Sequence, residues 1–375
     1  MIEHAVPQDV SPKKNKIPIR NLWHMLLYTW DRQHLINRWR AESEDSPSLD
    51  ALLAAILAGL IQQRMRIGLG RGYRRFEGET ASIRGRIVFS ESAKRLSFQR
   101  GRAVCRYEIF SANVLKNKII KTTLERLVQL GEFGTRLEAR SIRSRLRRVA
   151  RQLVDVDTIE IKPEIVRREL LNRQDNDYAL MLEICHLILR RQMPTEDAGD
   201  SSLPFLDRDS LTLWKVYESF VAKFYKCHLV DWHIEPQKIF NWPAKSPSKY
   251  LPVMKPDLVM THRPSGRRIV LDTKFTAHSL VQGQWGGIGF SSASLYQLYA
   301  YLRSQEHLSE HHECCEGILL YPAARYQLAE RIRMHGHTLR WQTIDLSQSW
   351  ENVESDLLAI PIIQDQHDEL TLSKI

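Results

Sequence analysis

Two aspartates and a lysine in the C-terminal half of the sequence have the types and spacing of a hydrolytic site. Asp272 and Lys274 lie two residues apart in LDTKF, and Asp257 precedes them in KPD. Because successive strand residues face opposite ways, Asp272 and Lys274 should share one face of a strand. Two carboxylates can hold Mg²⁺, or Mn²⁺ in its place, and a lysine can orient or deprotonate a water. We therefore predict a phosphodiester-cleaving site with Asp257, Asp272 and Lys274 as its catalytic residues.

Each of these residues also has a simpler explanation. Asp257 could merely flank a turn, and Asp272 and Lys274 could form a salt bridge at a sheet edge. However, Asp272 follows the apolar run 269–271, so it should enter a buried setting where a carboxylate needs a partner or a metal. Taken together, the three residues favour a site.

The elements predicted around these residues describe an α/β (α+β) domain with a mixed sheet. Residues 210–230 and 292–305 carry apolar side chains at helical spacing. Residues 254–262 and 267–276 form a hairpin around the turn sequence Arg-Pro-Ser-Gly, and residues 316–323 form a short apolar strand. Strands preceded and followed by helices in this order build a mixed sheet with helices packed on it.

The N-terminal half is predicted to be helical, with a projecting β element. Helical periodicity covers residues 17–30, 48–70, 112–133 and 135–156, whereas glycines punctuate short runs between about 70 and 106. A short-chained polar segment at 193–204 marks the domain boundary. We therefore expect a flexible tail over 1–16, an N-terminal partner-binding domain over 17–195 with a β-rich projection over 70–106, and a nuclease domain over 203–375.

The charge of the 375-residue chain is unevenly distributed. Of its formal net charge of +10, the segment 61–150 holds 22 Lys/Arg against 7 Asp/Glu, a net of +15, which leaves −5 for the rest. A basic segment of this kind favours binding to nucleic acid or to an acidic protein partner, although it could also be a solvated surface without a ligand. The chain has no apolar run long enough for a membrane helix, no signal-peptide core and five unpatterned cysteines, so we expect a cytoplasmic protein without membrane contact. It has no GxxxxGK[ST] motif, so we expect it to bind no nucleotide itself.

The catalytic set resembles the PD-(D/E)XK nuclease superfamily. Pro256-Asp257 matches the PD half and Asp272-Thr273-Lys274 matches the DXK half, with a hairpin turn between them. The resemblance implies that Glu218, on the preceding helix, is an additional metal ligand. It also implies that Gln297 and Tyr301 form the supporting glutamine–tyrosine motif of RecB-like members. Glu218 could instead be a solvated helix residue, and Gln297 and Tyr301 could be mere neighbours on one helix face.

A wider set of motifs resembles the McrC family. IPIRNLWHMLLYTWD, ASIRGRIVFSESAKR, ANVLKNKIIKTTLERL, KPDLVM, IVLDTKF and GILLYP follow in the family's order between about residues 17 and 350. The resemblance implies the DNA endonuclease subunit of a 5-methylcytosine-dependent restriction system. It also implies a hexameric AAA+ GTPase partner resembling McrB, which holds the GTP and recognises the methylated site. The N-terminal part would enter the partner's pore and stimulate GTP hydrolysis, and the C-terminal domain would cut double-stranded DNA.

Five arginines of the predicted projection are candidate contacts for that partner: Arg71, Arg74, Arg75, Arg84 and Arg86. They could instead contact DNA phosphates. Two other functions remain open, namely a stand-alone repair or recombination nuclease of RecB-like type and a non-enzymatic regulator of a ring NTPase. A nuclease with one site per chain needs two copies to cut both strands, so a nuclease-domain dimer is a further hypothesis.

Overall fold

The chain divides into two compact units. The computed structural model describes residues 17–169, 171, 175–191, 208–244, 246, 248–275, 281–282, 288–323 and 328–362. The first unit, named the sheet unit, combines residues 17–38 with the described residues from 208 onward. The second, named the helical unit, contains residues 39–169, 171 and 175–191. No helix in these described ranges is both long and apolar enough to span a bilayer.

The sheet unit is built on a six-stranded mixed sheet with strand order β10-β11-β9-β6-β5-β4. Neighbours β5 and β6 are antiparallel, whereas β6 with β9 and β9 with β11 are parallel. The strands are β4 Trp232–Pro236, β5 Leu258–His262, β6 Arg268–Thr273, β9 Glu316–Pro322, β10 Ala329–Met334 and β11 His337–Ile344. The mixed sheet, the hairpin and the apolar strand expected from the sequence are therefore confirmed.

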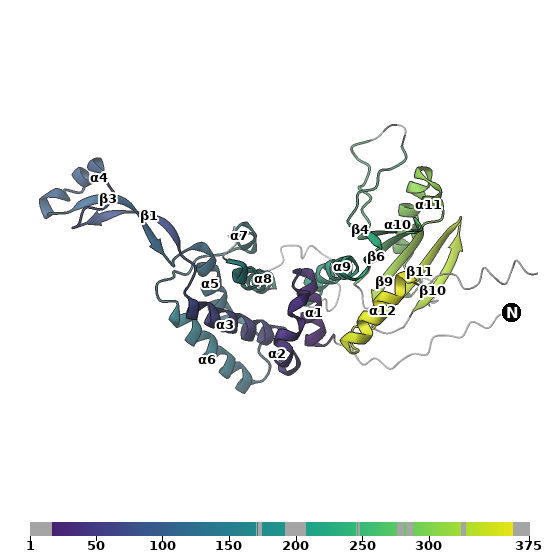
Figure 1. Ribbon diagram of the computed structural model, residues 1–375, viewed down its shortest axis with the longest axis horizontal. Coiled ribbons are helices and arrows are strands. Elements are labelled where there is room, and N and C mark those ends of the chain that lie inside the picture. Colours follow the sequence, from purple (N-terminus) through teal and green to yellow (C-terminus); the bar gives the residue numbers. More distant parts are fainter. Residues whose placement is uncertain are drawn as a thin grey trace, which may run out of the picture. The chain divides into compact units, whose positions relative to one another are not determined.

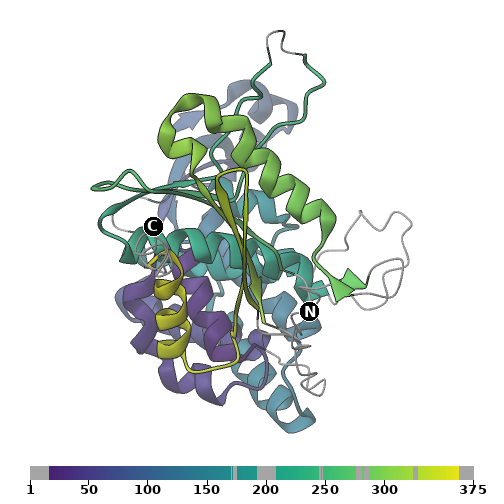
Figure 2. The same ribbon diagram turned by 90° about the vertical axis from the view of Figure 1, so that its right-hand side faces the viewer.

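Helices cover the two faces of this sheet. Helix α10 (Ser292–Gln305) packs Leu298 and Leu302 into one apolar cluster with Val270 and Leu319. Helix α9 (Arg208–His228) lies on the opposite face, as Figure 2 shows. Every residue of β9 is buried, as expected for a central strand covered on both faces. Because strand residues alternate between faces, Asp272 faces the same side as Val270, the side on which α10 lies.

The first helix belongs to the sheet unit. Helix α1 (Ile19–Thr29) packs against α9, and Trp23 is fully buried there. Asn21 Nδ2 donates hydrogen bonds to the carbonyl oxygens of Leu346 and Gln348, both at 2.8 Å. The predicted N-terminal domain over 17–195 is therefore wrong for residues 17–38. An apolar stripe shows that a helix needs covering, but the stripe does not identify the surface that covers it.

The sheet unit also contains the C-terminal helix and several short elements. Helix α12 (Trp350–Ile362) contacts β11, and Tyr225 of α9 donates a hydrogen bond to the carbonyl oxygen of Leu357 at 3.0 Å. The other short elements are β7 Val281–Gln282, β8 Ile288–Gly289 and α11 Glu310–Glu313. The C-terminal sequence after Val353, which falls outside the motif series, thus continues as helix to Ile362.

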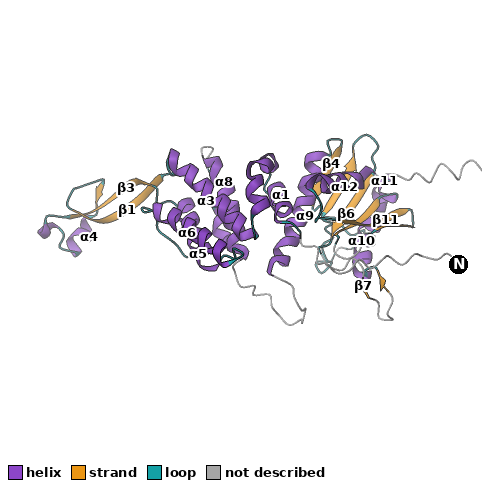
Figure 3. Cartoon of the chain, turned by 90° about the horizontal axis from the view of Figure 1, so that it is seen from below, coloured by secondary structure: helices purple, strands orange, loops and turns teal. Residues whose placement is uncertain are grey.

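The helical unit consists of packed helices that carry a small sheet. The helices are α2 Arg40–Asp45, α3 Leu49–Ile67, α5 Leu115–Leu130, α6 Arg136–Gln152, α7 Pro163–Arg168 and α8 Asn176–Arg191. Ser48 caps α3, and Thr135 with Glu138 forms a capping box at the start of α6. Figure 3 shows that the strands of this unit are confined to its projecting end.

The projection is an antiparallel sheet with strand order β1-β3-β2. Its strands are β1 Gly72–Thr80, β2 Arg86–Ile87 and β3 Ala103–Ser111. Figure 1 shows them extending away from α3, α5 and α6, as the sequence predicts for a projecting β element. The short helix α4 (Phe89–Lys94) was not expected, and β3 continues beyond residue 106.

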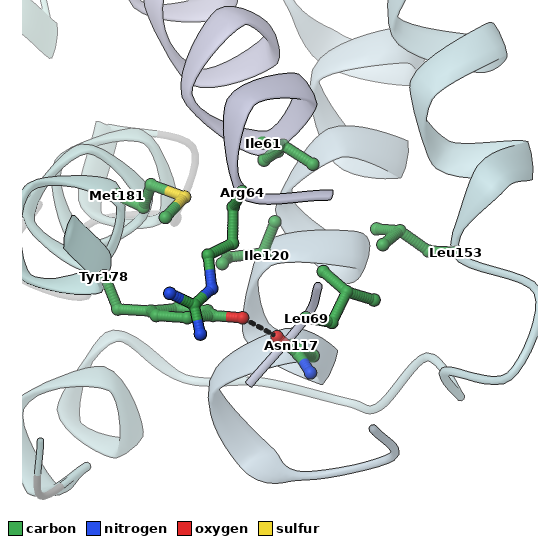
Figure 4. Close-up of a pocket in the computed structure, with 8 residues that line it drawn as sticks. All are labelled: Ile61, Arg64, Leu69, Asn117, Ile120, Leu153, Tyr178 and Met181. Atoms are coloured by element: carbon green, nitrogen blue, oxygen red, sulfur yellow. Dashed lines mark hydrogen bonds between the residues drawn. The ribbon is translucent and has the colours of Figure 1, made fainter. Parts of the chain in front are cut away.

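Hydrogen bonds fix the base of this projection to the helices. Tyr178 Oη of α8 accepts from the Gly70 amide at 2.8 Å and donates to Asn117 Oδ1 at 2.7 Å. Asn117 Nδ2 donates to the carbonyl oxygens of Gly70 and Ala112, at 2.9 and 2.6 Å. Gly70 and Ala112 are the residues where the chain enters and leaves the projection. Figure 4 shows the Arg64 side chain against the Tyr178 ring, with its guanidinium carbon 5.1 Å from the ring centroid.

Candidate active site

The β5–β6 hairpin places the two predicted aspartates side by side. Leu258 of β5 pairs with Leu271 of β6, so the adjacent residues Asp257 and Asp272 lie opposite each other at one end of the sheet. Asp272 lies within β6, and Lys274 follows directly after its last residue. The sequence pattern predicts Asp257 within the strand, whereas β5 begins one residue later, at Leu258.

Asp257 is oriented by the neighbouring strand. Its Oδ2 accepts hydrogen bonds from the backbone amide of Thr273 at 2.7 Å and from Thr273 Oγ1 at 2.6 Å. Its other carboxylate oxygen makes no hydrogen bond to any residue that the structure describes. One oxygen of Asp257 is therefore fixed by the protein, and the other is available to a ligand.

Asp272 is a buried carboxylate in a strongly acidic surrounding. Its side chain is only 4% exposed, and its Oδ2 lies 2.5 Å from Lys274 Nζ. Burial is the largest cause that raises the pKa of Asp272 to about 6, followed by the negative charge of Asp257. The Lys274 ammonium lowers this pKa but does not offset the two larger effects. A positive ion bound between the carboxylates would favour the charged form of Asp272.

Lys274 is held by a chain of side chains from α10. Lys274 Nζ donates to Gln297 Oε1 at 2.8 Å, and Gln297 Nε2 donates to Tyr301 Oη at 2.9 Å. Burial and the negative charge of Asp272 raise the pKa of Tyr301, so its hydroxyl stays neutral at ordinary pH. Gln297 and Tyr301 are therefore more than neighbours on a helix face. They connect α10 to the lysine at the end of β6.

Glu218 of α9 lies near the two aspartates but is not grouped with them. Its carboxylate accepts a hydrogen bond from Gln237 Nε2. Burial, followed by the negative charge of Asp257, raises the pKa of Glu218. The charge of Glu218 in turn contributes to the raised pKa of Asp272. The three carboxylates thus share one electrostatic environment, which a cation would stabilise.

These residues line an open cleft of about 370 Å³. Four of the residues predicted from the sequence line it: Asp257, Asp272, Lys274 and Gln297. Its walls also contain four residues that were not predicted: Trp214, Lys255, Thr273 and Phe275. Thr273 and Phe275 adjoin Lys274 in the sequence, and Lys255 lies two residues before Asp257, so proximity to the motifs could have identified them. Trp214 could not be found this way, because only the packing of α9 brings it to the cleft.

The donor atoms of the cleft fit a hard divalent cation. Among the described residues, no three His, Cys, Asp or Glu side chains are grouped closely enough to hold a metal by themselves. Mg²⁺, however, is usually bound through one or two carboxylates together with waters and substrate phosphates. Asp257 offers one carboxylate oxygen without a hydrogen bond. Asp272 Oδ2 is buried and is paired with the Lys274 ammonium, which leaves its negative charge partly offset. These two carboxylates suit a Mg²⁺ or Mn²⁺ ion that shares its remaining positions with a phosphate.

The five arginines predicted to contact a partner lie in the helical unit, and all are exposed. Arg74 Nη1 lies 3.9 Å from Asp157 Oδ2. The other four form no ion pair with any described residue: Arg71, Arg75, Arg84 and Arg86. Exposed aromatic side chains accompany them, including Tyr73 and Phe110, whose ring centroids are 5.1 Å apart. The projection thus presents a mixed aromatic and cationic surface.

Comparisons with known proteins agree with both units of the fold. The family model described as McrBC 5-methylcytosine restriction system component matches residues 6–322. The chain is 26% identical over 348 residues to the type IV methyl-directed restriction enzyme EcoKMcrBC of Escherichia coli strain K12, covering 92% of this chain and 97% of that relative. Its fold is similar to a chain in a half-complex of Thermococcus gammatolerans McrB AAA+ hexamers with bound McrC. That match has a TM-score of 0.56 and 16% identity, and covers 93% of this chain and 78% of the other.

Proposed function

The chain belongs to the family of McrBC 5-methylcytosine restriction system components, and on that premise we propose that it is the Mg²⁺-dependent DNA endonuclease subunit of such a system. The observation that carries the proposal is the convergence of Asp257, Asp272 and Lys274 on one cleft. The substrate would be double-stranded DNA in the cytoplasm, and the reaction would be hydrolysis of a phosphodiester bond.

The residues of the cleft have distinct roles in this reaction. Asp257 and Asp272 would hold the metal, which would polarise the scissile phosphate and lower the pKa of a bound water. Lys274 directs its ammonium toward Asp272 and would stabilise the negative charge that develops on the phosphate. Gln297 fixes the Lys274 ammonium through its side-chain carbonyl oxygen. Glu218 would assist as a further acidic residue beside the metal.

Metal binding tests this assignment independently of DNA cleavage. We expect isothermal titration of the full chain with Mn²⁺ to show binding that Asp257→Asn and Asp272→Asn each weaken at least tenfold, the lower end of the usual effect of perturbing a metal site. Asp231→Asn, an exposed carboxylate in the same unit, is the matched control and should bind like the wild type. Unchanged Mn²⁺ affinity in both site variants would contradict the proposed metal site.

The proposed partner is a hexameric AAA+ GTPase resembling McrB, with GTP bound by that partner. Two observations support this: the solved relative is described as McrB AAA+ hexamers with bound McrC, and the projection exposes arginines and aromatic side chains together. Such a mixture is typical of protein–protein contacts, whose centres are enriched in aromatic residues and arginine. The projection would enter or line the ring of the partner.

Stimulation of the partner's GTPase tests this role. We expect Arg84→Gln/Arg86→Gln to reduce stimulation while the sheet unit stays folded. The matched control Arg100→Gln/Arg106→Gln removes the same charge from the same projection, from arginines already paired with Glu79 and Glu77. Equal stimulation by both double variants would contradict the partner assignment. DNA cleavage by the chain alone, without any NTPase, would instead support a stand-alone repair nuclease.

A further inference from the structure

Helix α6 of the helical unit carries a surface that neither the cleft nor the projection explains. Its 17 residues include seven arginines and one glutamate, a net charge of +6. The glutamate, Glu138, is occupied by the capping box, where it accepts from the Thr135 amide and hydroxyl at 2.8 Å. No lysine or aspartate occurs in the helix. The charge of this element is therefore almost purely that of arginine.

Packing fixes which side of α6 faces outward. Leu146 and Val149 are buried, and the helix packs against α3 and α5. Arg143 lies at the border, where its guanidinium donates to the carbonyl oxygens of Val128 and Gly131, both at 3.1 Å. Figure 1 shows α6 at the edge of the helical part of its unit. The opposite side of the helix is thus open to solvent.

The remaining six arginines are exposed on that side: Arg136, Arg140, Arg145, Arg147, Arg148 and Arg151. None of them forms an ion pair or hydrogen bond with a residue that the structure describes. At about 100° per residue, Arg136, Arg140, Arg147 and Arg151 fall within an arc of roughly 60°, along about 22 Å of helix. A duplex segment of the same length carries roughly a dozen phosphate charges over its two strands, one per about 1.7 Å.

The composition of this face distinguishes a nucleic acid from a protein partner. Protein–protein interfaces have an apolar, aromatic centre, whereas protein–DNA interfaces are polar and strongly positive. The projection exposes Tyr73, Phe89 and Phe110 among its arginines. By contrast, the single large apolar side chain exposed on α6 is Leu137, in its first turn. Guanidinium groups also bind phosphate oxygens in a two-pronged geometry that lysine lacks.

We propose that the arginine row of α6 is a DNA-binding surface, separate from the catalytic cleft, that contacts the phosphates of the duplex without reading its sequence. It depends on the proposed function only in taking double-stranded DNA as the substrate. Its role is to increase the affinity of the chain for the duplex that the cleft cuts. On this proposal the arginines of the projection are assigned to the protein partner rather than to DNA.

Salt dependence of DNA binding tests this surface. The full chain, without partner and in EDTA, is titrated with a fluorescent 30-bp duplex at several KCl concentrations, so that no cleavage occurs. The variant Arg140→Gln/Arg147→Gln should reduce the slope of log affinity against log salt by about 1.8, because each lost phosphate contact removes about 0.9. Arg140→Lys/Arg147→Lys keeps both charges, so its slope should differ from that of the wild type by less than about 0.9, half of the change expected for the glutamine variant.

The control Arg40→Gln/Arg303→Gln removes the same charge from arginines that already have carboxylate partners, Glu44 at 3.1 Å and Glu306 at 2.6 Å. It should leave the slope unchanged. An unchanged slope in the α6 glutamine variant would overturn the proposal. So would loss of GTPase stimulation by that variant with normal DNA binding, which would make the row a protein interface. Asp272→Ala should retain the wild-type slope, so a failure of the nuclease assignment is distinguishable from a failure of this surface.

Discussion

At the residue scale, the site depends on a carboxylate whose charged form is disfavoured in the folded chain. Burial and the nearby negative charges raise the pKa of Asp272 to about 6 in the fold, from an ordinary value of 3.8. Well below pH 3.8 the residue is protonated in both the folded and the unfolded state, and well above pH 6 it is charged in both. As pH rises between these values, the folded state holds a proton that the unfolded state has lost, so stability falls. A cation bound beside Asp272 would remove this cost by stabilising the charged carboxylate.

Replacing Asp272 should therefore stabilise the metal-free protein. We expect Asp272→Asn to raise the free energy of unfolding of the sheet unit at pH 8 by about 1–3 kcal/mol, since one pKa unit corresponds to about 1.4 kcal/mol and Lys274 loses its partner. At pH 4 the gain should be close to zero. Urea unfolding in EDTA at both pH values measures the difference. Asp231→Asn serves as the exposed control, and a pH-independent effect of Asp272→Asn would refute the explanation.

A second prediction at this scale concerns how Lys274 is positioned. Gln297→Leu removes the acceptor of the Lys274 ammonium while keeping the size of the side chain. The cleavage rate should fall by about 10–100-fold, a usual effect of losing a supporting residue, with DNA affinity unchanged. Tyr301→Phe should have a smaller effect in the same direction. Tyr296→Phe, at an exposed position on the same helix, is the control, and a loss of DNA affinity in Gln297→Leu would contradict a positioning role.

The convergence of Asp257, Asp272 and Lys274 on one cleft could be predicted because the three residues lie close together in the sequence. Asp272 and Lys274 are two residues apart along one strand, and Asp257 lies across a single hairpin. The alternation of side chains along a strand and the pairing of strands in a hairpin were therefore sufficient to bring them together. The connection through Gln297 to Tyr301 needed the packing of α10 on the sheet, and the cleft wall formed by Trp214 needed the packing of α9. Only the resemblance to a known superfamily singled out the glutamine–tyrosine motif in advance.

At the element scale, the projection is attached to its unit by a buried polar network. Tyr178 contacts the Gly70 amide and Asn117, and two cations lie over its ring, the Arg64 guanidinium at 5.1 Å and Lys116 Nζ at 4.9 Å from its centroid. Lys116 is itself paired with Asp175 at 2.6 Å, both nearly buried. Such a network holds the two ends of the projection in a fixed geometry.

Removing the Tyr178 hydroxyl should loosen this attachment. Tyr178→Phe leaves the Gly70 amide and Asn117 Oδ1 without their partner in a buried setting. We expect a loss of about 1–3 kcal/mol in the stability of the helical unit and faster hydrogen exchange at the Gly70 amide. The control Tyr73→Phe removes an exposed hydroxyl of the same projection and should change neither. Exchange at Gly70 that stays slow in Tyr178→Phe would contradict the proposed attachment.

Elements with strong local signals were predictable, and those defined by their neighbours were not. Helices α5 and α6 follow from helical periodicity, and the Thr135–Glu138 capping box gives α6 a sharp start. By contrast, α4 has six residues within a glycine-punctuated β region, and β10 and β11 form an antiparallel pair that is stabilised by the rest of the sheet. Their local sequences do not specify these structures without the surrounding packing.

At the scale of the whole molecule, the sheet unit is assembled from two distant parts of the chain. Helix α1 contributes Trp23, Met25 and Leu27, all fully buried, to a unit whose other described residues begin at 208. Tyr28 packs its ring against Phe220 at a centroid distance of 5.6 Å. Folding of the sheet unit therefore requires residues from both ends of the sequence.

A fragment that begins at residue 203 should consequently be defective. We expect it to aggregate or to unfold well below the full chain, because it exposes the apolar surface that α1 covers. A fragment in which residues 17–38 are joined to residue 203 by a flexible linker should unfold cooperatively. Circular dichroism melting of the two fragments is the measurement. Equal stability of the two would show that α1 is dispensable.

The most direct test of the central claim is cleavage of plasmid DNA by the full chain together with the proposed AAA+ partner. The assay contains Mg²⁺ and GTP and compares 5-methylcytosine-containing with unmethylated plasmid, for the wild type and for Asp272→Ala. We expect cleavage of the methylated plasmid that requires both partner and GTP and is abolished in Asp272→Ala, while GTPase stimulation is retained. Cleavage that persists in Asp272→Ala would contradict the assignment of the cleft as the nuclease site.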